Sequence, residues 1–172
     1  ETAAKFYEKA FDKWPSNTRL ANKLSSLYLV KLRQNAKALY FSNRALQIEK
    51  NNETALLNAA IASANMQDIQ QAEQHFKQAA QTSCPSKEVL LSYAAFNEER
   101  QKYNEAIGLL ERSDTLHGAC LDSMVASARI YDKMGKYNKA TERYQTILTS
   151  GFRIPPDLSK YISGRVTHKS SL

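Results

Sequence analysis

The sequence has little of the two residues that most often turn a backbone. It contains five Gly and four Pro among 172 residues. Sheets built from hairpins need such residues at most connections, because tight turns require backbone conformations that Gly, Pro or Asn supply. The scarcity excludes a hairpin-rich all-β fold and favours long helices joined by short connections.

Long hydrophobic runs and cysteines are scarce as well. No stretch approaches the roughly 18 consecutive apolar residues of a membrane span, and the N-terminus carries no signal-peptide pattern. Because the chain opens with Glu1 rather than Met, we expect it to be part of a longer chain. Cys84 and Cys120 are too few for a metal cluster or a disulfide framework, so we expect free thiols.

What the sequence does contain is a period of small residues. One series recurs at intervals of 34 residues and consists of Ala38, Ala72, Ala106 and Ala140. A second series precedes the first by 12 residues, or by 13 in the first case, and consists of Ser25, Ala60, Ala94 and Ala128. The extra residue of the first repeat is assigned to the KLRQN connection at 31–35, which makes that repeat 35 residues long.

Close packing explains why small residues recur in pairs. Two antiparallel helices approach tightly only where neither carries a bulky side chain at the crossing. One such pair cannot bury its apolar face alone, so stacked pairs must complete the core.

This pattern resembles the tetratricopeptide-repeat (TPR) family along nearly the whole chain. Residues 121–154 match it well, with Met124, Ala128, Tyr131, Ala140 and Tyr144 at the family's large, small and aromatic positions. The resemblance implies an all-α fold, a right-handed α-solenoid of helix-turn-helix repeats.

The repeat register predicts the organisation of the chain. Residues 1–17 form only the second helix of a truncated repeat, so we expect further repeats on the N-terminal side of the chain. Four TPR-like repeats follow at 18–52, 53–86, 87–120 and 121–154. Residues 155–172 form a capping helix, with Asp157 as its N-cap, and a frayed tail from Gly164 onward. Ser42 and Ser63 replace aromatic residues of the family pattern, so we expect loose packing near both.

No residue constellation indicates catalysis. His75, His117 and His168 lie far apart in the register, and the sequence contains no HExxH, CxxC or glycine-rich phosphate motif. We therefore predict no catalytic, cofactor or metal residues, and a protein that is not an enzyme.

The charge distribution argues against nucleic acid as the partner. The formal net charge of +7 divides into +6 over residues 1–52, −4 over 53–118 and +5 over 119–172. A binding groove for single strands needs basic residues interleaved with aromatic ones. Tyr40, Phe41 and Arg44 come closest, but we expect both aromatic residues to pack between repeats.

The family resemblance places partner binding on a concave face lined by the first helices of successive repeats. The matching residues, with Leu29 and Val30 further along the first of these helices, are Arg19, Asn22, Lys23, Ser26, Leu57, Asn58, Ile61, Asn65, Leu91, Ser92, Glu98, Glu99, Asp122, Val125, Arg129, Asp132 and Lys133. Asn58 and Asn65 draw attention because an amide can bond both groups of a ligand backbone. Glu88 would repel a carboxylate, which argues against the carboxylate clamp that some TPR proteins use for chaperone tails.

The leading hypothesis is a non-enzymatic protein-interaction scaffold. It would hold a partner peptide or helix in the concave groove, assemble a larger complex, and need no cofactor. The alternative is a TPR spacer or periplasmic arm of a bacterial envelope export or assembly machine for polysaccharide, pilus or outer-membrane components. Cytoplasm and bacterial periplasm both remain open as compartments.

Overall fold

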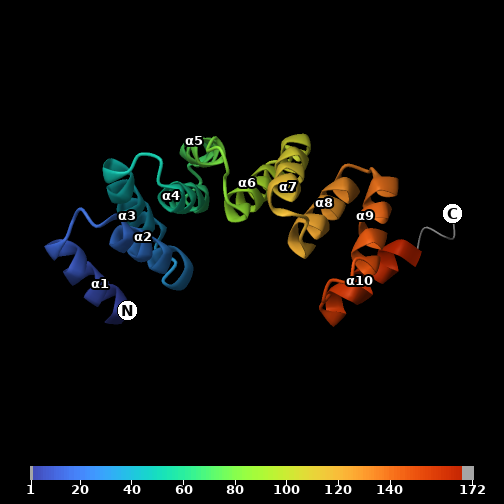
Figure 1. Ribbon diagram of the computed structural model, residues 1–172, viewed down its shortest axis with the longest axis horizontal. Coiled ribbons are helices and arrows are strands. Elements are labelled where there is room, and N and C mark those ends of the chain that lie inside the picture. The colour runs from blue at the N-terminus through green and yellow to red at the C-terminus, as the bar shows by residue number, and fades with distance from the viewer. Residues whose placement is uncertain (1, 168–172) are drawn as a thin grey trace. The chain divides into compact units, whose positions relative to one another are not determined.

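The computed structural model describes residues 2–167, and every regular element in that range is helical. The chain divides into two compact units, Glu1–Pro85 (unit 1) and Ser86–Leu172 (unit 2). The helices of unit 1 are α1 (Thr2–Lys13), α2 (Thr18–Ser26), the π-helical turn η1 (Leu27–Lys31), α3 (Asn35–Ile48), α4 (Glu53–Asn65) and α5 (Ile69–Ala80). Those of unit 2 are α6 (Lys87–Glu99), α7 (Tyr103–His117), α8 (Leu121–Lys133), α9 (Tyr137–Thr149) and α10 (Pro156–Thr167) (Figure 1). The expected all-α repeat fold is confirmed.

Polar side chains start the first helix of three successive repeats. The side chains of Asn17, Asn52 and Ser86 each accept a hydrogen bond from the backbone N–H three residues later. Such caps satisfy one of the N–H groups that a helix end leaves without a partner. Each of these caps lies directly before the first residue of its helix.

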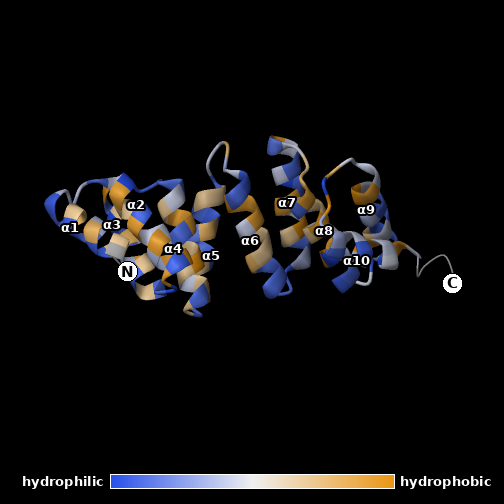
Figure 2. Ribbon diagram, turned by 90° about the horizontal axis from the view of Figure 1, so that it is seen from below, coloured by the Kyte–Doolittle hydropathy of each residue, from blue (hydrophilic) through white to orange (hydrophobic). Residues whose placement is uncertain are grey.

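Both series of small residues lie at the helix crossings. Every member is at most 2% exposed. Within the units α2 packs on α3, α4 on α5, α6 on α7 and α8 on α9. Large apolar residues fill the space beside these crossings, so hydrophobic residues alternate with hydrophilic ones along helices such as α4 and α7 (Figure 2).

The turn between the two helices of each pair repeats the same backbone conformation. Arg33, Gln67, Gln101 and Gly135 all have a positive φ, between 52° and 69°, and are spaced by 34 residues. The period from turn to turn is therefore constant through all four helix pairs. The extra residue of the first repeat must lie before Arg33, within the helix rather than in the connection.

The π-helical turn η1 holds that extra residue. The amide of Leu32 donates to the carbonyl of Leu27, five residues back, at 3.2 Å, and the amide of Gln34 donates to the carbonyl of Tyr28 at 2.9 Å. Inserting one residue into a helix without moving its ends widens one turn in this way. The placement of the insertion at 31–35 was therefore wrong, because the helix absorbs it one turn earlier.

The expected loose packing near Ser42 and Ser63 is also wrong. Both side chains are fully buried. The hydroxyl of Ser25 donates to the carbonyl of Ala38 at 2.9 Å and lies 2.6 Å from the Ser42 hydroxyl, which therefore donates to it. Ser63 donates to Gln71 Oε1 at 2.9 Å. At both positions hydrogen bonds take the place of the packing that an aromatic ring gives in the family pattern. The buried hydroxyl groups of Ser42 and Ser63 therefore each have a partner.

Helix α10 closes the core of unit 2. Ile162 is fully buried and packs into the cluster that contains Tyr144 and Ile147. The helix starts at Pro156, so Asp157 lies in its first turn and is not the N-cap. It continues through Gly164 to Thr167, so the tail expected to fray from Gly164 is helical up to that point. His168 and the rest of the tail lie outside the described residues.

A candidate partner-binding site in unit 1

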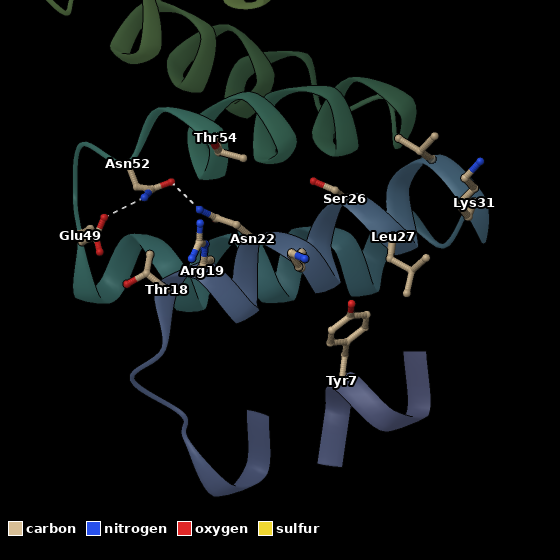
Figure 3. Close-up of a pocket in the computed structure, with 12 residues that line it drawn as sticks. Tyr7, Thr18, Arg19, Asn22, Ser26, Leu27, Lys31, Glu49, Asn52 and Thr54 are labelled. Carbon is tan, nitrogen blue, oxygen red and sulfur yellow. Dashed lines mark hydrogen bonds between the residues drawn. The ribbon is translucent and has the colours of Figure 1, made fainter. Parts of the chain in front are cut away.

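A cavity of about 740 Å³ lies among α1, α2, η1 and the connection between α3 and α4 (Figure 3). Helix α2 supplies one side, and the Tyr7 ring rises toward it from α1. The lining residues are Tyr7, Thr18, Arg19, Asn22, Lys23, Ser26, Leu27, Val30, Lys31, Glu49, Asn52 and Thr54. Four of them, Arg19, Asn22, Lys23 and Ser26, belong to the predicted groove, and Val30 was predicted further along the same helix.

A chain of amides orders one end of the cavity. Asn22 Nδ2 donates to Asn52 Oδ1 at 2.9 Å, and Asn52 Nδ2 donates to Glu49 Oε2 at 2.8 Å (Figure 3). Hydrogen bonds from Asn52 and Thr18 lower the pKa of Glu49, so its carboxylate is ionised at neutral pH. Asn22 Oδ1 is buried and accepts no hydrogen bond from any described group. This end therefore combines a fixed negative charge with one acceptor that still lacks a donor.

Three cations line the same cavity. Arg19, Lys23 and Lys31 are exposed. The Lys23 ammonium lies 5.9 Å from the centroid of the Tyr7 ring, at the outer limit of a cation–π contact. Within residues 2–167 neither Arg19 nor Lys31 forms an ion pair. The lining contains one carboxylate, that of Glu49, so it carries a net positive charge.

The turn η1 brings apolar residues and a cation to the cavity. It contributes Leu27, Val30 and Lys31, and the Val30 side chain is 66% exposed. Sequence comparison with the repeat does not identify Tyr7, Leu27, Lys31, Glu49 or Asn52 as site residues. For Leu27 and Lys31 the available signal was the 13-residue spacing from Ser25 to Ala38, because it reveals the insertion that forms η1. Tyr7, Glu49 and Asn52 come from other segments and reach the cavity through packing.

A second hollow of about 510 Å³ adjoins the first at Val30, which lines both. Its lining residues are Leu29, Val30, Arg33, Asn35, Ile61 and Asn65. Ile61 and Asn65 were predicted groove residues, and Leu29 and Val30 were predicted further along the first helix. Asn65 Nδ2 donates to Asn35 Oδ1 at 3.2 Å, but the Asn65 side chain is exposed.

Asn58 and Leu57 lie beneath this surface. Asn58 is 7% exposed and donates from Nδ2 to Ser26 Oγ at 2.9 Å, which ties α4 to α2. Leu57 is 6% exposed. Their positions support the groove from below, whereas Arg19, Asn22, Lys23 and Asn65 reach its surface.

Comparisons with known proteins give the fold a name. No family model and no curated protein matches the sequence. Among solved structures, TTC0263 of Thermus thermophilus, described as a thermophilic TPR protein, superposes with a TM-score of 0.74 at 16% identity, over 96% of this chain and 89% of that one. YrrB, described as a TPR protein with an unusual peptide-binding site, gives 0.69 at 14% identity, over 84% and 74%. The chain has the tetratricopeptide-repeat fold.

A third TPR-like neighbour is PilW, described as a type IV pilus biogenesis factor. It superposes with a TM-score of 0.78 at 17% identity, over 91% of this chain and 72% of that one. Identities this low establish the shared architecture alone.

In unit 2 three of the predicted groove residues, Glu98, Arg129 and Lys133, form hydrogen bonds and ion pairs with one another. Glu98 is 5% exposed and accepts hydrogen bonds from Arg129 Nε at 2.9 Å, Arg129 Nη2 at 2.7 Å and Lys133 Nζ at 2.8 Å. Burial alone would raise the pKa of Glu98, but the hydrogen bonds and charges of Arg129 and Lys133 outweigh burial and lower that pKa. Asp132 pairs with Arg165 of α10 and accepts a hydrogen bond from the Tyr144 hydroxyl at 3.1 Å. We call these six residues the ion network of unit 2.

The remaining predicted residues of unit 2 lie on α6 and α8 and line neither hollow described above. They are Leu91, Ser92, Glu99, Asp122 and Val125. Their role in binding a partner stays a prediction.

The structure also shows the surroundings of a histidine, two aromatic residues and the two cysteines of this TPR chain that were named above from the sequence. His75 is partly buried, and that burial lowers its pKa. Phe41 is buried as expected and stacks on Tyr28 with centroids 5.7 Å apart, but Tyr40 is 56% exposed, so the expectation that both would be packed was wrong for Tyr40. Cys84 and Cys120 are free thiols, as expected.

Residues 2–167 contain no group of three or more His, Cys, Asp or Glu side chains that could hold a metal ion. No helix within those residues is long and apolar enough to cross a bilayer.

Proposed function

We propose that this TPR chain is a non-enzymatic protein-interaction scaffold that holds an extended segment of a partner protein along the two hollows of unit 1. The observation that carries the proposal is the lining of the larger cavity. It places exposed Val30, the cations Arg19 and Lys31, and the amide of Asn22 around one space of about 740 Å³.

The size and chemistry of this space suit a peptide. Ligand pockets of proteins measure roughly 300–1,000 Å³ and combine an apolar lining with a few fixed polar groups. A side chain of the partner can contact Tyr7, Leu27 and Val30, while Arg19 and Lys31 can pair with its polar groups. Because packed helices form the walls, little ordering of the scaffold opposes binding. No cofactor is required.

The structural neighbours support this assignment at the level of the fold. YrrB is described as having a peptide-binding site. Repeat scaffolds present extended surfaces because each repeat contacts only its neighbours, and such surfaces suit extended segments of partner proteins.

The test uses the whole chain and a random peptide display library. Peptides selected on the wild-type chain are then measured against Val30→Asp, and against Leu116→Asp as a matched control. Leu116 is an exposed leucine on α7 in unit 2, at 42% exposure. We expect Val30→Asp to weaken the selected peptides at least tenfold and the control to leave their affinity unchanged. Equal binding to both variants, or no selected peptide at all, would overturn the proposal.

A second candidate is an architectural role in an assembly machine, such as a spacer or periplasmic arm. The similarity to PilW, a type IV pilus biogenesis factor, favours it. A purely architectural chain needs no peptide site, so it predicts that Val30→Asp leaves every interaction of the chain intact.

A further inference from the structure

The charges of the larger cavity specify the chemistry of its occupant. We infer that the partner segment bound in unit 1 is an acidic, extended peptide whose carboxylates stand on alternate residues, with apolar side chains between them. This inference rests on the function proposed above and adds the substrate class of the same site.

The spacing of the cations sets the spacing of the carboxylates. Arg19 and Lys23 stand four residues apart on α2, which is about 6 Å along a helix axis. In an extended peptide, side chains on the same face recur about every 6.6 Å. Lys31 lies toward the opposite end of the cavity from Arg19 (Figure 3), about 18 Å along the helix by the same rise. An extended segment of about seven residues covers that length, with its first, third and seventh side chains opposite the three cations.

The apolar lining argues for a peptide rather than a polyanion. Tyr7, Leu27 and Val30 lie among the cations, and the phosphates of a nucleic acid or a lipid headgroup would leave them without apolar contacts. The ionised carboxylate of Glu49 stands at the Arg19 end and repels a continuous run of negative charge. A peptide can place a neutral residue opposite Glu49.

The size of the effect follows from exposed ion pairs. Each such pair changes an affinity by up to about fivefold. Three pairs acting together therefore separate an acidic peptide from its neutral counterpart by about tenfold or more at low salt, and the difference shrinks as salt screens the charges.

The experiment compares three acetylated and amidated octapeptides on the full chain by isothermal titration calorimetry. They repeat Glu-Val, Gln-Val or Lys-Val four times, and each is measured at low salt and at about 0.3 M salt. We expect the Glu peptide to bind at least tenfold tighter than the Gln peptide, and the Lys peptide to bind weakest. Lys31→Glu is expected to weaken the Glu peptide by fivefold or more. Lys160→Glu, an exposed position on α10 with the same change in net charge, is expected to leave it unchanged.

Each other outcome has a distinct meaning. If the Gln and Glu peptides bind equally and Val30→Asp abolishes both, the acidic inference is wrong while the proposed function stands. If neither these peptides nor the selected library peptides depend on Val30, both are wrong. If inorganic polyphosphate or phosphatidylserine vesicles displace the Glu peptide and bind Val30→Asp as well as wild type, the cavity is a general anion site and the peptide inference is overturned.

Discussion

Removing Arg129 should destabilise unit 2 by a predictable amount. Its guanidinium donates two of the three hydrogen bonds that the Glu98 carboxylate accepts, and Glu98 is 5% exposed. A hydrogen bond to a charged group contributes about 1.5–3 kcal/mol. The Arg129 side chain is half exposed, so solvent screening reduces the value toward that of a surface pair. We expect Arg129→Met to lower the free energy of unfolding by about 2 kcal/mol.

The assay is urea denaturation of the whole chain, followed by circular dichroism. With a slope of about 2 kcal/mol/M, the midpoint should fall by about 1 M. Arg153→Met is the matched control, because Arg153 is exposed in the connection between α9 and α10 and pairs with no described carboxylate. Its midpoint should match that of the wild type.

The pH dependence of this difference has a definite sign. The pKa of Glu98 is lowered in the folded chain, so its stabilising contribution is present above the unfolded pKa of about 4.3 and is lost as the pH falls through the folded pKa. The gap between wild type and Arg129→Met should therefore be full at pH 7 and narrow below about pH 4. A gap under about 0.5 kcal/mol at pH 7, or one that persists unchanged in acid, would refute the reasoning.

Three further perturbations test the fold. Gln101→Gly should stabilise the chain by about 1 kcal/mol in thermal unfolding, because Gln101 has a φ of 60°, which glycine adopts more readily. Gln81→Gly, at a φ of −81°, should destabilise the chain. Stability changes of the same sign in both variants would contradict this. Deleting Val30 should convert η1 into α-helix with the circular dichroism spectrum retained, while the affinity for selected peptides falls at least tenfold; unchanged affinity would show that η1 does not shape the site. Ser42→Ala should cost about 1 kcal/mol in urea denaturation, because the Ser25 hydroxyl loses its donor; no loss would show that the pair is neutral.

The helical repeat could be read from the sequence because it depends on small residues at fixed spacing. Burial of Ala72 or Ala128 follows from the register alone, and the structure confirms it. The location of the inserted residue could not be read in the same way. The sequence shows that the inserted residue lies between Ser25 and Ala38. Whether the helix or the loop contains it depends on backbone hydrogen bonds such as that of Leu32 to Leu27.

The candidate site was only partly predictable for a related reason. Arg19 and Lys23 follow from the first-helix register, whereas Tyr7 comes from α1 and Glu49 from the connection between α3 and α4, and both enter the cavity through packing. The pairing of Glu98 with Arg129, 31 residues away, likewise depends on how α6 and α8 align. Register therefore predicts which residues share a face, but not whether that face remains free for a partner.

The most direct test of the central claim is to locate a selected peptide on the chain by nuclear magnetic resonance. The account predicts intermolecular contacts from the peptide to the Tyr7 ring and the Val30 methyl groups in unit 1. Contacts confined to unit 2, with the Tyr7 and Val30 signals unmoved at saturation, would contradict it.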